Sequence, residues 1–267
     1  MLDRARQLLA AALLASCATL AHSAGSVFLE ELTSTALQSQ VRAGKTTVLV
    51  PIGGTEQNGP HMVLGKHNVR VKALCERIAT ALGNTLVAPV LAYVPEGGID
   101  PPTSHMRFAG TLTIPQATFE SILESTARSL RASGFRDIVF VGDHGGYRRS
   151  LQAVAARLGR EWKNTPARVH ALPEYYWALE TEYAAALKAR GHADAAIGTH
   201  AGLADTSLAL AVDPALVRKA ELDSPHADAA HGVRGDPRRA SEALGMLGVD
   251  AIVRESVAAI TRAVKRK

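Results

Sequence analysis

The sequence TTVLVPIGGTEQNGPHMVLGKH (residues 46–67) decides the fold. Its first part, residues 46–53, is a β-branched apolar run that ends at glycines, a pattern typical of a strand buried on both faces. The loop that follows holds one carboxylate, one amide and two imidazoles: Glu56, Asn58, His61 and His67. A solvated turn uses the glycines and the proline of this loop but has no need of the imidazoles. We therefore expect a buried strand with functional side chains at its carboxyl end.

Apolar strand-like runs alternate with helix-like segments along the rest of the chain. Further strands are predicted over residues 84–94, 137–143 and 167–173. Helical spacing of apolar residues predicts helices over 69–82, 115–134, 147–162 and 175–191. A last helix should follow Pro237, with Asp236 as its N-cap. This order predicts an α/β protein: a three-layer α/β/α sandwich with a mostly parallel central sheet.

The composition excludes some classes of protein. The chain has 267 residues, 47% of them hydrophobic, and a net charge of +5. No block of lysine and arginine interrupts its interior, so a nucleic-acid partner is not indicated. No linker or low-complexity segment divides residues 25–267, which we expect to form a single domain.

Residues 1–24 have the layout of a secretory signal. Arg4 and Arg6 precede an apolar run from Leu8, and small residues follow near Ala24. The run is too short to stay in a membrane as a permanent span. We expect a signal peptide and a periplasmic or secreted mature chain without a transmembrane span. The alternative is a lipoprotein anchored at Cys17, because residues 14–17 resemble a lipobox.

Two more segments gather polar groups. VGDHGGY (141–147) carries Asp143 and His144, and GTHAGLADTSLAL (198–210) carries His200 and Asp205. A glutamate with two histidines from separate loops is the ligand set of a catalytic zinc. Structural roles stay open for the same groups: a histidine at a strand end is often a hydrogen-bond partner, Asp143 could cap the next helix, and the opening loop could be a turn without metal.

Five motifs, in order, resemble the creatininase family of metal-dependent amidohydrolases. TEQNGPHMVLGKH resembles its TEQHGPHLPLGTD motif, VGDHGGY its NGHGGN, and HAGLADTSL its HAGxxETSL. RFAGTLTI (107–114) resembles the FPGT segment, and GDPRRAS (235–241) the C-terminal GDP motif. The similarity runs from Val27 to Ala263. It implies a layered α/β/α fold and a homo-oligomer, a hexamer.

The resemblance also implies roles for residues in these motifs. It places metal-binding groups at Glu56 and His144, and the catalytic acid/base at His200. The family's metal-binding histidine corresponds to Asn58, a weak amide ligand, and its metal-bridging aspartate corresponds to His67.

These departures predict fewer metal ions. A carboxylate can bridge two cations, whereas a neutral imidazole offers one lone pair to one metal. A further carboxylate ligand of creatininase corresponds to Gly146. We therefore expect one ion per chain, zinc with manganese or iron as alternatives, held by a His₂Glu set. Its ligands are Glu56, His67 and His144, with Asn58 as a weak fourth candidate.

The remaining candidates carry two interpretations each. Asp205 could orient His200 or reach the metal, and is a candidate catalytic residue with it. His61 and His105 are candidates for the substrate pocket or for structural hydrogen bonds. Trp177 could cover the substrate or pack in the core.

The sequence thus predicts an exported metal-dependent amidohydrolase. It would cleave a non-peptide C–N bond, in an amide that could be cyclic, of a small molecule through metal-activated water. The main alternative is a non-catalytic ligand- or metal-binding protein on the same fold, and a weaker one is a hydrolase of another bond, such as a lactone.

Overall fold

The centre of the fold is a sheet of four parallel strands. The computed structural model describes residues 25–265, so the predicted signal peptide lies outside the described residues. The strands run in the order β2-β1-β3-β4. Their bounds are Thr47–Ile52 (β1), Thr85–Val87 (β2), Asp137–Gly142 (β3) and Arg168–Ala171 (β4). The predicted parallel α/β architecture is confirmed.

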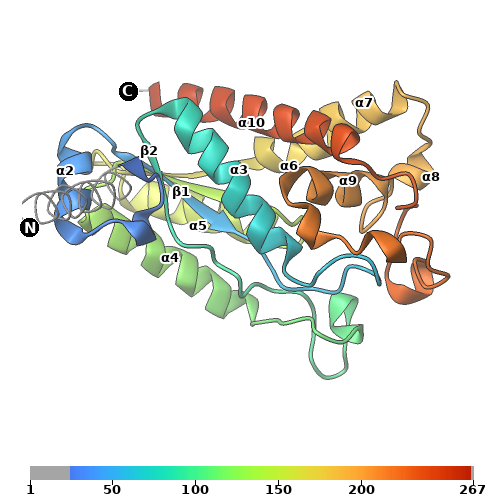
Figure 1. Cartoon of the computed structure of the whole chain (residues 1–267). Helices are drawn as coiled ribbons and strands as arrows, with labels where there is room; N and C mark the ends of the chain where they lie inside the picture. Colours follow the sequence, from blue (N-terminus) through green and yellow to red (C-terminus); the bar gives the residue numbers. More distant parts are fainter. Residues whose placement is uncertain (1–24, 266–267) are drawn as a thin grey trace, which may run out of the picture.

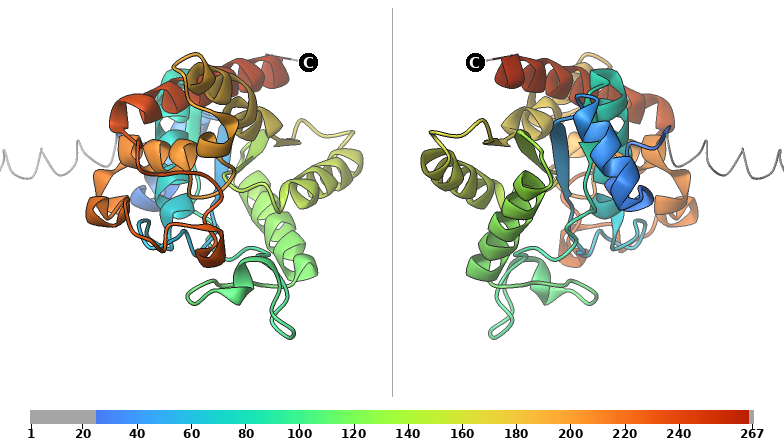
Figure 2. Two further views of the ribbon diagram at one scale, coloured as in Figure 1. Left: turned by 90° about the vertical axis from the view of Figure 1, so that its right-hand side faces the viewer. Right: turned by 90° about the vertical axis from the view of Figure 1, so that its left-hand side faces the viewer.

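Helices cover both faces of this sheet (Figures 1 and 2). Alternate residues of a strand point to opposite faces. In β1, Val48 and Val50 belong to the apolar core with α4 and α5, while Leu49 belongs to the core with α3, α6, α9 and α10. All three side chains are fully buried. This is why the strand appears in the sequence as an uninterrupted apolar run.

The helices are as follows. The longer ones are α2 (Ser34–Arg42), α3 (Lys66–Leu82), α4 (Gln116–Ala132), α5 (Arg148–Glu161), α9 (Leu203–Val212) and α10 (Glu242–Lys265). The predicted helix over 175–191 is a succession of α6 (Pro173–Ala178), a π-helical turn η3 (Leu179–Tyr183) and α7 (Ala184–Lys188). Short helices complete the structure: η1 (Leu29–Glu31), η2 (Ser104–Arg107), α8 (Asp194–Ile197), η4 (Pro214–Leu216), η5 (Lys219–Glu221) and η6 (Ala229–His231). None of the helices within 25–265 is both long and apolar enough to cross a membrane.

Two predicted elements have different bounds. The second strand ends at Val87 rather than continuing to residue 94, because Pro89 has no N–H to extend the ladder. The last helix begins at Glu242 and not after Pro237. The Asp236 carboxylate instead accepts the backbone N–H of Arg238 within a turn.

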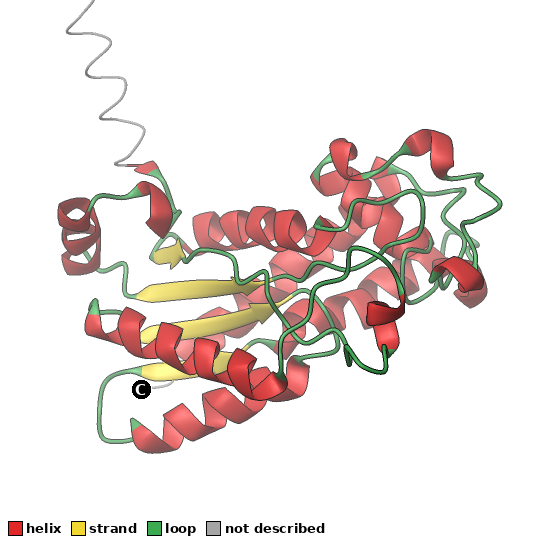
Figure 3. Ribbon diagram, turned by 90° about the horizontal axis from the view of Figure 1, so that it is seen from below, coloured by secondary structure: helices red, strands yellow, loops and turns green. Residues whose placement is uncertain are grey.

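The carboxyl ends of β1 and β3 lie side by side. Ile52 is paired with Gly142, so the loops that follow the two strands leave the sheet at the same edge (Figure 3). β1 leads through α3 to β2 on one side of it, and β3 leads through α5 to β4 on the other side, so the chain connections diverge between β1 and β3. Ligands of open α/β sheets bind at such a switch point. The predicted polar segments therefore meet where a binding site is expected.

Candidate active site with a metal cluster

Four side chains form a compact group of potential metal ligands at this edge. One ligand atom from each lies within 4.8 Å of those of the others. The Glu56 Oε2 atom is 3.3 Å from His105 Nε2 and 3.6 Å from His144 Nε2. Glu56 and Glu96 are buried, and the two histidines are partly buried. We call this group the metal cluster: Glu56, Glu96, His105 and His144.

The chemistry of the cluster fits a divalent cation. Oε2 of Glu56, both carboxylate oxygens of Glu96 and Nδ1 of His105 are buried without a hydrogen-bond partner among the described residues. Buried polar atoms are nearly always hydrogen-bonded, since an unpaired one is costly. Carboxylate oxygens and imidazole nitrogens are the ligands of zinc, manganese and iron.

The two glutamates have opposite pKa shifts. Burial favours a neutral Glu56, but the hydrogen bond from His67 and the charges of His67, His144 and Lys66 outweigh it, so its pKa lies well below the usual range. Burial and the negative charge of Glu56 raise the pKa of Glu96 to about 9. The metal-free cluster near pH 7 therefore holds one carboxylate and one carboxylic acid.

Glu96 was not predicted from the sequence. It lies in PEGG, after the irregular segment that follows β2, and its backbone N–H donates to Thr113 Oγ1. Gly54 has a φ of 148°, and a Cβ there would come within 2.8 Å of the Glu96 carboxylate. An acidic residue followed by two glycines after an apolar run is the signal that could have identified it.

His67 lies beside the metal cluster, between two carboxylates. Its Nε2 is 2.8 Å from Glu56 Oε1 and its Nδ1 is 2.5 Å from Asp143 Oδ2. Burial and the Lys66 charge lower its pKa, but these two hydrogen bonds prevail and the net shift is upward. The imidazolium form thus donates to both carboxylates. Metal binding by His67 remains a prediction, and it would require the loss of one of these protons.

A buried ionic network continues from His67. Arg70 Nη2 lies 2.8 Å from Asp143, and Arg70 Nη1 lies 2.6 Å from Asp205. Lys66, which is fully buried in the first turn of α3, contacts Asp205 and lies 4.0 Å from Glu56 Oε1. Asp143 does not cap α5, which begins at Arg148 without a side-chain cap. Asp205 pairs with Lys66 and Arg70, and within 25–265 it makes no hydrogen bond to His200.

His200 lies on the other side of Glu56. Its Nδ1 is 3.6 Å from Glu56 Oε1, and its Nε2 is 2.9 Å from the backbone oxygen of Gln57. Burial, together with the charge of Lys66, lowers the pKa of His200 to about 3. The neutral ring therefore donates through Nε2 and keeps the Nδ1 lone pair on the side of the metal cluster.

Three other predicted residues lie elsewhere. Both amide protons of Asn58 are donated to backbone oxygens of its own loop, those of Glu56 and Val63, at 2.9 and 3.1 Å. His61 is fully buried, and its Nε2 contacts the Ala201 oxygen and the Thr206 hydroxyl. These contacts favour a structural hydrogen-bonding role for His61 over a place in the substrate pocket. Trp177 is 47% exposed on α6, so core packing is wrong for it.

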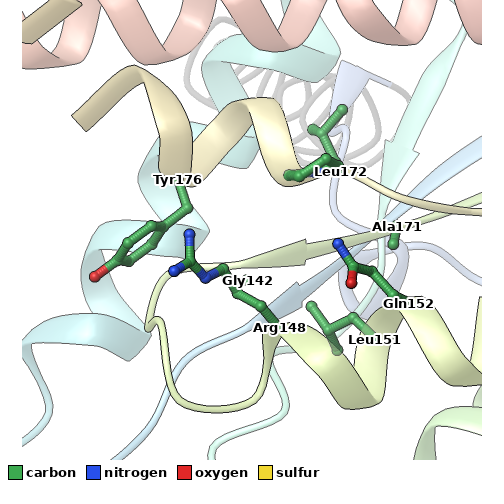
Figure 4. Close-up of a pocket in the computed structure, with 8 residues that line it drawn as sticks. Gly142, Arg148, Leu151, Gln152, Ala171, Leu172 and Tyr176 are labelled. Carbon is green, nitrogen blue, oxygen red and sulfur yellow. The ribbon is translucent and has the colours of Figure 1, made fainter. Parts of the chain in front are cut away.

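A cavity of about 510 Å³ adjoins the metal cluster. His105, His144 and His200 line one part of it, and residues of α3 and of α6 to α9, together with Asp143 and Arg234, line the rest. The Tyr176 side chain lines this cavity and also a second, smaller pocket (Figure 4). In the second pocket the Arg148 guanidinium lies 4.6 Å from the centre of the Tyr176 ring. The volume suits a small molecule or a few residues of an extended peptide.

Comparisons with known proteins agree with this architecture. The family described as Creatininase: Creatinine amidohydrolase matches residues 30–260. The mycofactocin precursor peptide peptidase of Mycolicibacterium smegmatis is 30% identical over 223 residues, covering 80% of this chain and 78% of the relative. The creatinine amidohydrolase of Pseudomonas putida is 32% identical over 124 residues, 45% of each chain.

Solved structures extend the similarity to the whole fold. A structure described as "Creatininase Mn" has a TM-score of 0.76 at 26% identity, covering 90% of this chain and 99% of that one. A mutant creatininase of the Zn-Zn type has a TM-score of 0.74 at the same identity and coverage. With its parallel sheet, its metal cluster and a match over residues 30–260, this chain belongs to the creatininase family.

Proposed function

We propose that this protein is a metal-dependent hydrolase that cleaves a non-peptide C–N amide bond, open or cyclic, of a small molecule. One observation carries the proposal: the Glu56 carboxylate, whose Oε2 is an unpaired ligand atom of the metal cluster, has its Oε1 3.6 Å from Nδ1 of His200, beside a cavity large enough for a substrate. A metal and a base at the same carbonyl are the minimal equipment for amide hydrolysis.

The metal cluster would hold one divalent ion, zinc or, by the names of the related structures, manganese. When bound, such an ion lowers the pKa of a water molecule toward 7 and polarises a carbonyl. Glu56 and Glu96 supply negative charge, and His105 and His144 supply neutral nitrogens, because burial lowers the pKa of both rings.

His200 is the candidate for proton transfer. Its Nε2–H donates to the Gln57 backbone oxygen, which fixes the ring and its tautomer. The opposite nitrogen can then take a proton from the attacking water and deliver it to the leaving nitrogen. Its pKa of about 3 describes the metal-free site, so at neutral pH the ring starts as a base.

Lys66 and Arg70 limit the site to one ion. They already pair with Asp143 and Asp205, the two further carboxylates of the site. These two cations, and His67 in its protonated form, are the positive groups next to Glu56, Asp143 and Asp205. The carboxylates available to a metal are then those of the metal cluster.

The test is a hydrolysis assay on protein depleted of metal and reloaded with Zn²⁺ or Mn²⁺. The panel contains creatinine, linear N-acyl amines, a lactone and short peptides, since the relatives include a peptidase and an amidohydrolase. We expect metal-dependent cleavage of a non-peptide amide. Cleavage of peptides alone would reassign the substrate, cleavage of the lactone alone would reassign the bond, and ligand binding without turnover would favour a binding protein.

We further propose that the mature chain is exported and forms a homo-oligomer. The layout of residues 1–24 supports export, and the family resemblance supports a hexamer. Intact-mass measurement of protein from the native envelope should show a chain that begins near Ala24. A diacylated chain that begins at Cys17 would indicate a lipoprotein, and a chain starting at Met1 would contradict both. Light scattering tests the oligomer.

A further inference from the structure

Among the residues that the structure describes, most of the charged side chains that line the cavity are paired with a group of opposite charge, and one is not. Its cationic side chains are Lys66, Arg70, Lys188 and Arg234. Its carboxylates outside the metal cluster are Asp143, Glu180, Asp194 and Asp205. These groups decide what charge a substrate meets beyond the reacting amide.

Each of the four carboxylates is already paired. Lys66 and Arg70 hold Asp143 and Asp205. Lys188 lies 2.7 Å from Asp194, and Arg148 lies 3.2 Å from Glu180.

Arg234 differs from the other lining cations, because its guanidinium has no carboxylate partner within residues 25–265. The cavity therefore presents one uncompensated positive side chain in addition to any bound metal.

Backbone pairing places Arg234 next to the candidate base. Arg234 and His200 form an antiparallel bridge, in which the Arg234 N–H donates to the His200 oxygen at 2.8 Å. Side chains of directly opposed residues in such a pair project to the same side, with Cβ atoms about 5 Å apart. Arg234 is exposed while His200 is 8% exposed, so the guanidinium lies at the mouth and the imidazole deeper.

The backbone of Arg234 is also fixed in place. Its carbonyl oxygen accepts the Thr199 N–H at 2.8 Å. A Cβ at Gly198 would come within 2.0 Å of the same oxygen, so the two segments approach as closely as glycine permits. A charge on a fixed backbone loses less entropy when it binds a ligand.

We propose that Arg234 binds a carboxylate of the substrate, and that the natural substrate is an amide that carries such a group, such as an N-acyl amino acid. This inference rests on the proposed hydrolase function and specifies its substrate class. Water adds across the amide: its oxygen bonds to the carbonyl carbon, the C–N bond breaks, and a proton goes to the nitrogen. The carboxylate held by Arg234 is unchanged and leaves with one product. Guanidinium and carboxylate form paired charge-assisted hydrogen bonds, which gives both affinity and orientation.

The experiment compares matched substrates on the metal-loaded protein. N-acetyl-L-alanine is compared with N-acetyl-L-alaninamide by acetate release, and succinamic acid with butyramide by ammonia release. The first pair places the carboxylate on the amine side, and the second on the acyl side. We expect kcat/KM to favour the carboxylate member of at least one pair by about 10–100-fold.

Variants assign that preference to Arg234. In Arg234→Gln the ratio should fall to within about threefold of unity, and Arg234→Lys should retain part of it. Arg238→Gln is the control, because Arg238 is on the same loop but is paired with Asp236 and does not line the cavity. An unchanged ratio in Arg234→Gln, or a wild type that prefers neither carboxylate, overturns the inference.

A failure of the proposed function gives a different result. If no member of either pair is hydrolysed, the same four compounds are titrated into the metal-loaded wild type and Arg234→Gln by calorimetry. Tighter binding of a carboxylate member that depends on Arg234 supports the inference without catalysis. Equal binding, or none, overturns it.

Discussion

Replacing Glu96 by glutamine should abolish the release of a proton that accompanies metal binding. In the metal-free protein the pKa of Glu96 is about 9, so near pH 7 its carboxyl is protonated. A metal binds the ionised form, and the proton must leave. Glu56 is already ionised, and His144, with a pKa of about 4, is already neutral. We therefore expect about one proton per ion.

The cost of this deprotonation sets the pH dependence of affinity. The interval from pH 7 to a pKa of about 9 corresponds to about 2.7 kcal/mol, or roughly 100-fold in apparent affinity. Because protons compete with the metal, affinity should rise about tenfold per pH unit from pH 6 and level off above pH 9.

The same shift affects the stability of the metal-free chain. The pKa of Glu96 is raised above its ordinary value of 4.5, because burial in the folded chain favours the protonated carboxyl. The contribution of this carboxyl to the free energy of unfolding is therefore complete below pH 4.5 and is lost as the pH rises to 9. Metal-free Glu96→Gln should therefore lose less Tm than the wild type between pH 5 and 9.

Calorimetric titration with Mn²⁺ in buffers of different ionisation enthalpy counts the protons. Glu180→Gln is the matched control, because Glu180 lines the same cavity but pairs with Arg148 outside the metal cluster. It should release a proton like the wild type, while Glu96→Gln releases none and binds more weakly. Proton release by Glu96→Gln equal to that of the wild type, with undiminished affinity, would refute Glu96 as a ligand.

Three further predictions concern His200 and the charges around the metal cluster. His200→Ala should keep its metal and lose about 10²–10⁴-fold in turnover, and loss of metal would make His200 a ligand instead. The double variant Asn58→His, His67→Asp should still bind one ion. The Lys66 ammonium would repel a second divalent ion about 4–6 Å away by about 5–8 kcal/mol. Adding Lys66→Thr to that pair should raise the metal content found by elemental analysis, and an unchanged content would show that Lys66 is irrelevant. Lys66→Met should lower the free energy of unfolding in urea by about 3–5 kcal/mol, against at most about 1 kcal/mol for Lys72→Met, whose Lys72–Glu30 pair is exposed. Equal losses would contradict the buried network.

The regular part of the site followed from the sequence. Residues 46–53 and 137–143 were predictable as buried strands because short apolar runs bounded by glycine are typical of such strands. Parallel strands place their carboxyl ends at one edge, so Glu56 and His144 were expected close together, and their ligand atoms are 3.6 Å apart. Family resemblance added His200, which lines the same cavity as His144.

The irregular part of the site did not follow. Glu96 and His105 lie in the long segment after β2, whose path depends on glycines and prolines and has no periodicity to interpret. Glu96 was therefore missed, and His105 was a candidate for the substrate pocket or a structural hydrogen bond but not for the metal cluster. Lys66 and Arg70 look like solvated residues of an amphipathic helix, yet both pair with Asp205, more than 130 residues away. Such pairs depend on tertiary packing. The same limitation applies to Trp177, which the helical pattern left undecided between covering the substrate and packing in the core.

The metal content of the natively purified protein tests the central claim most directly. After exhaustive dialysis, elemental analysis of the wild type should give close to one divalent ion per chain, and Glu56→Gln with Glu96→Gln should give none while remaining folded by circular dichroism. Two tightly held ions in the wild type would contradict the role assigned to Lys66 and Arg70. A folded wild type without any ion would contradict the metal-dependent hydrolase and favour a binding protein.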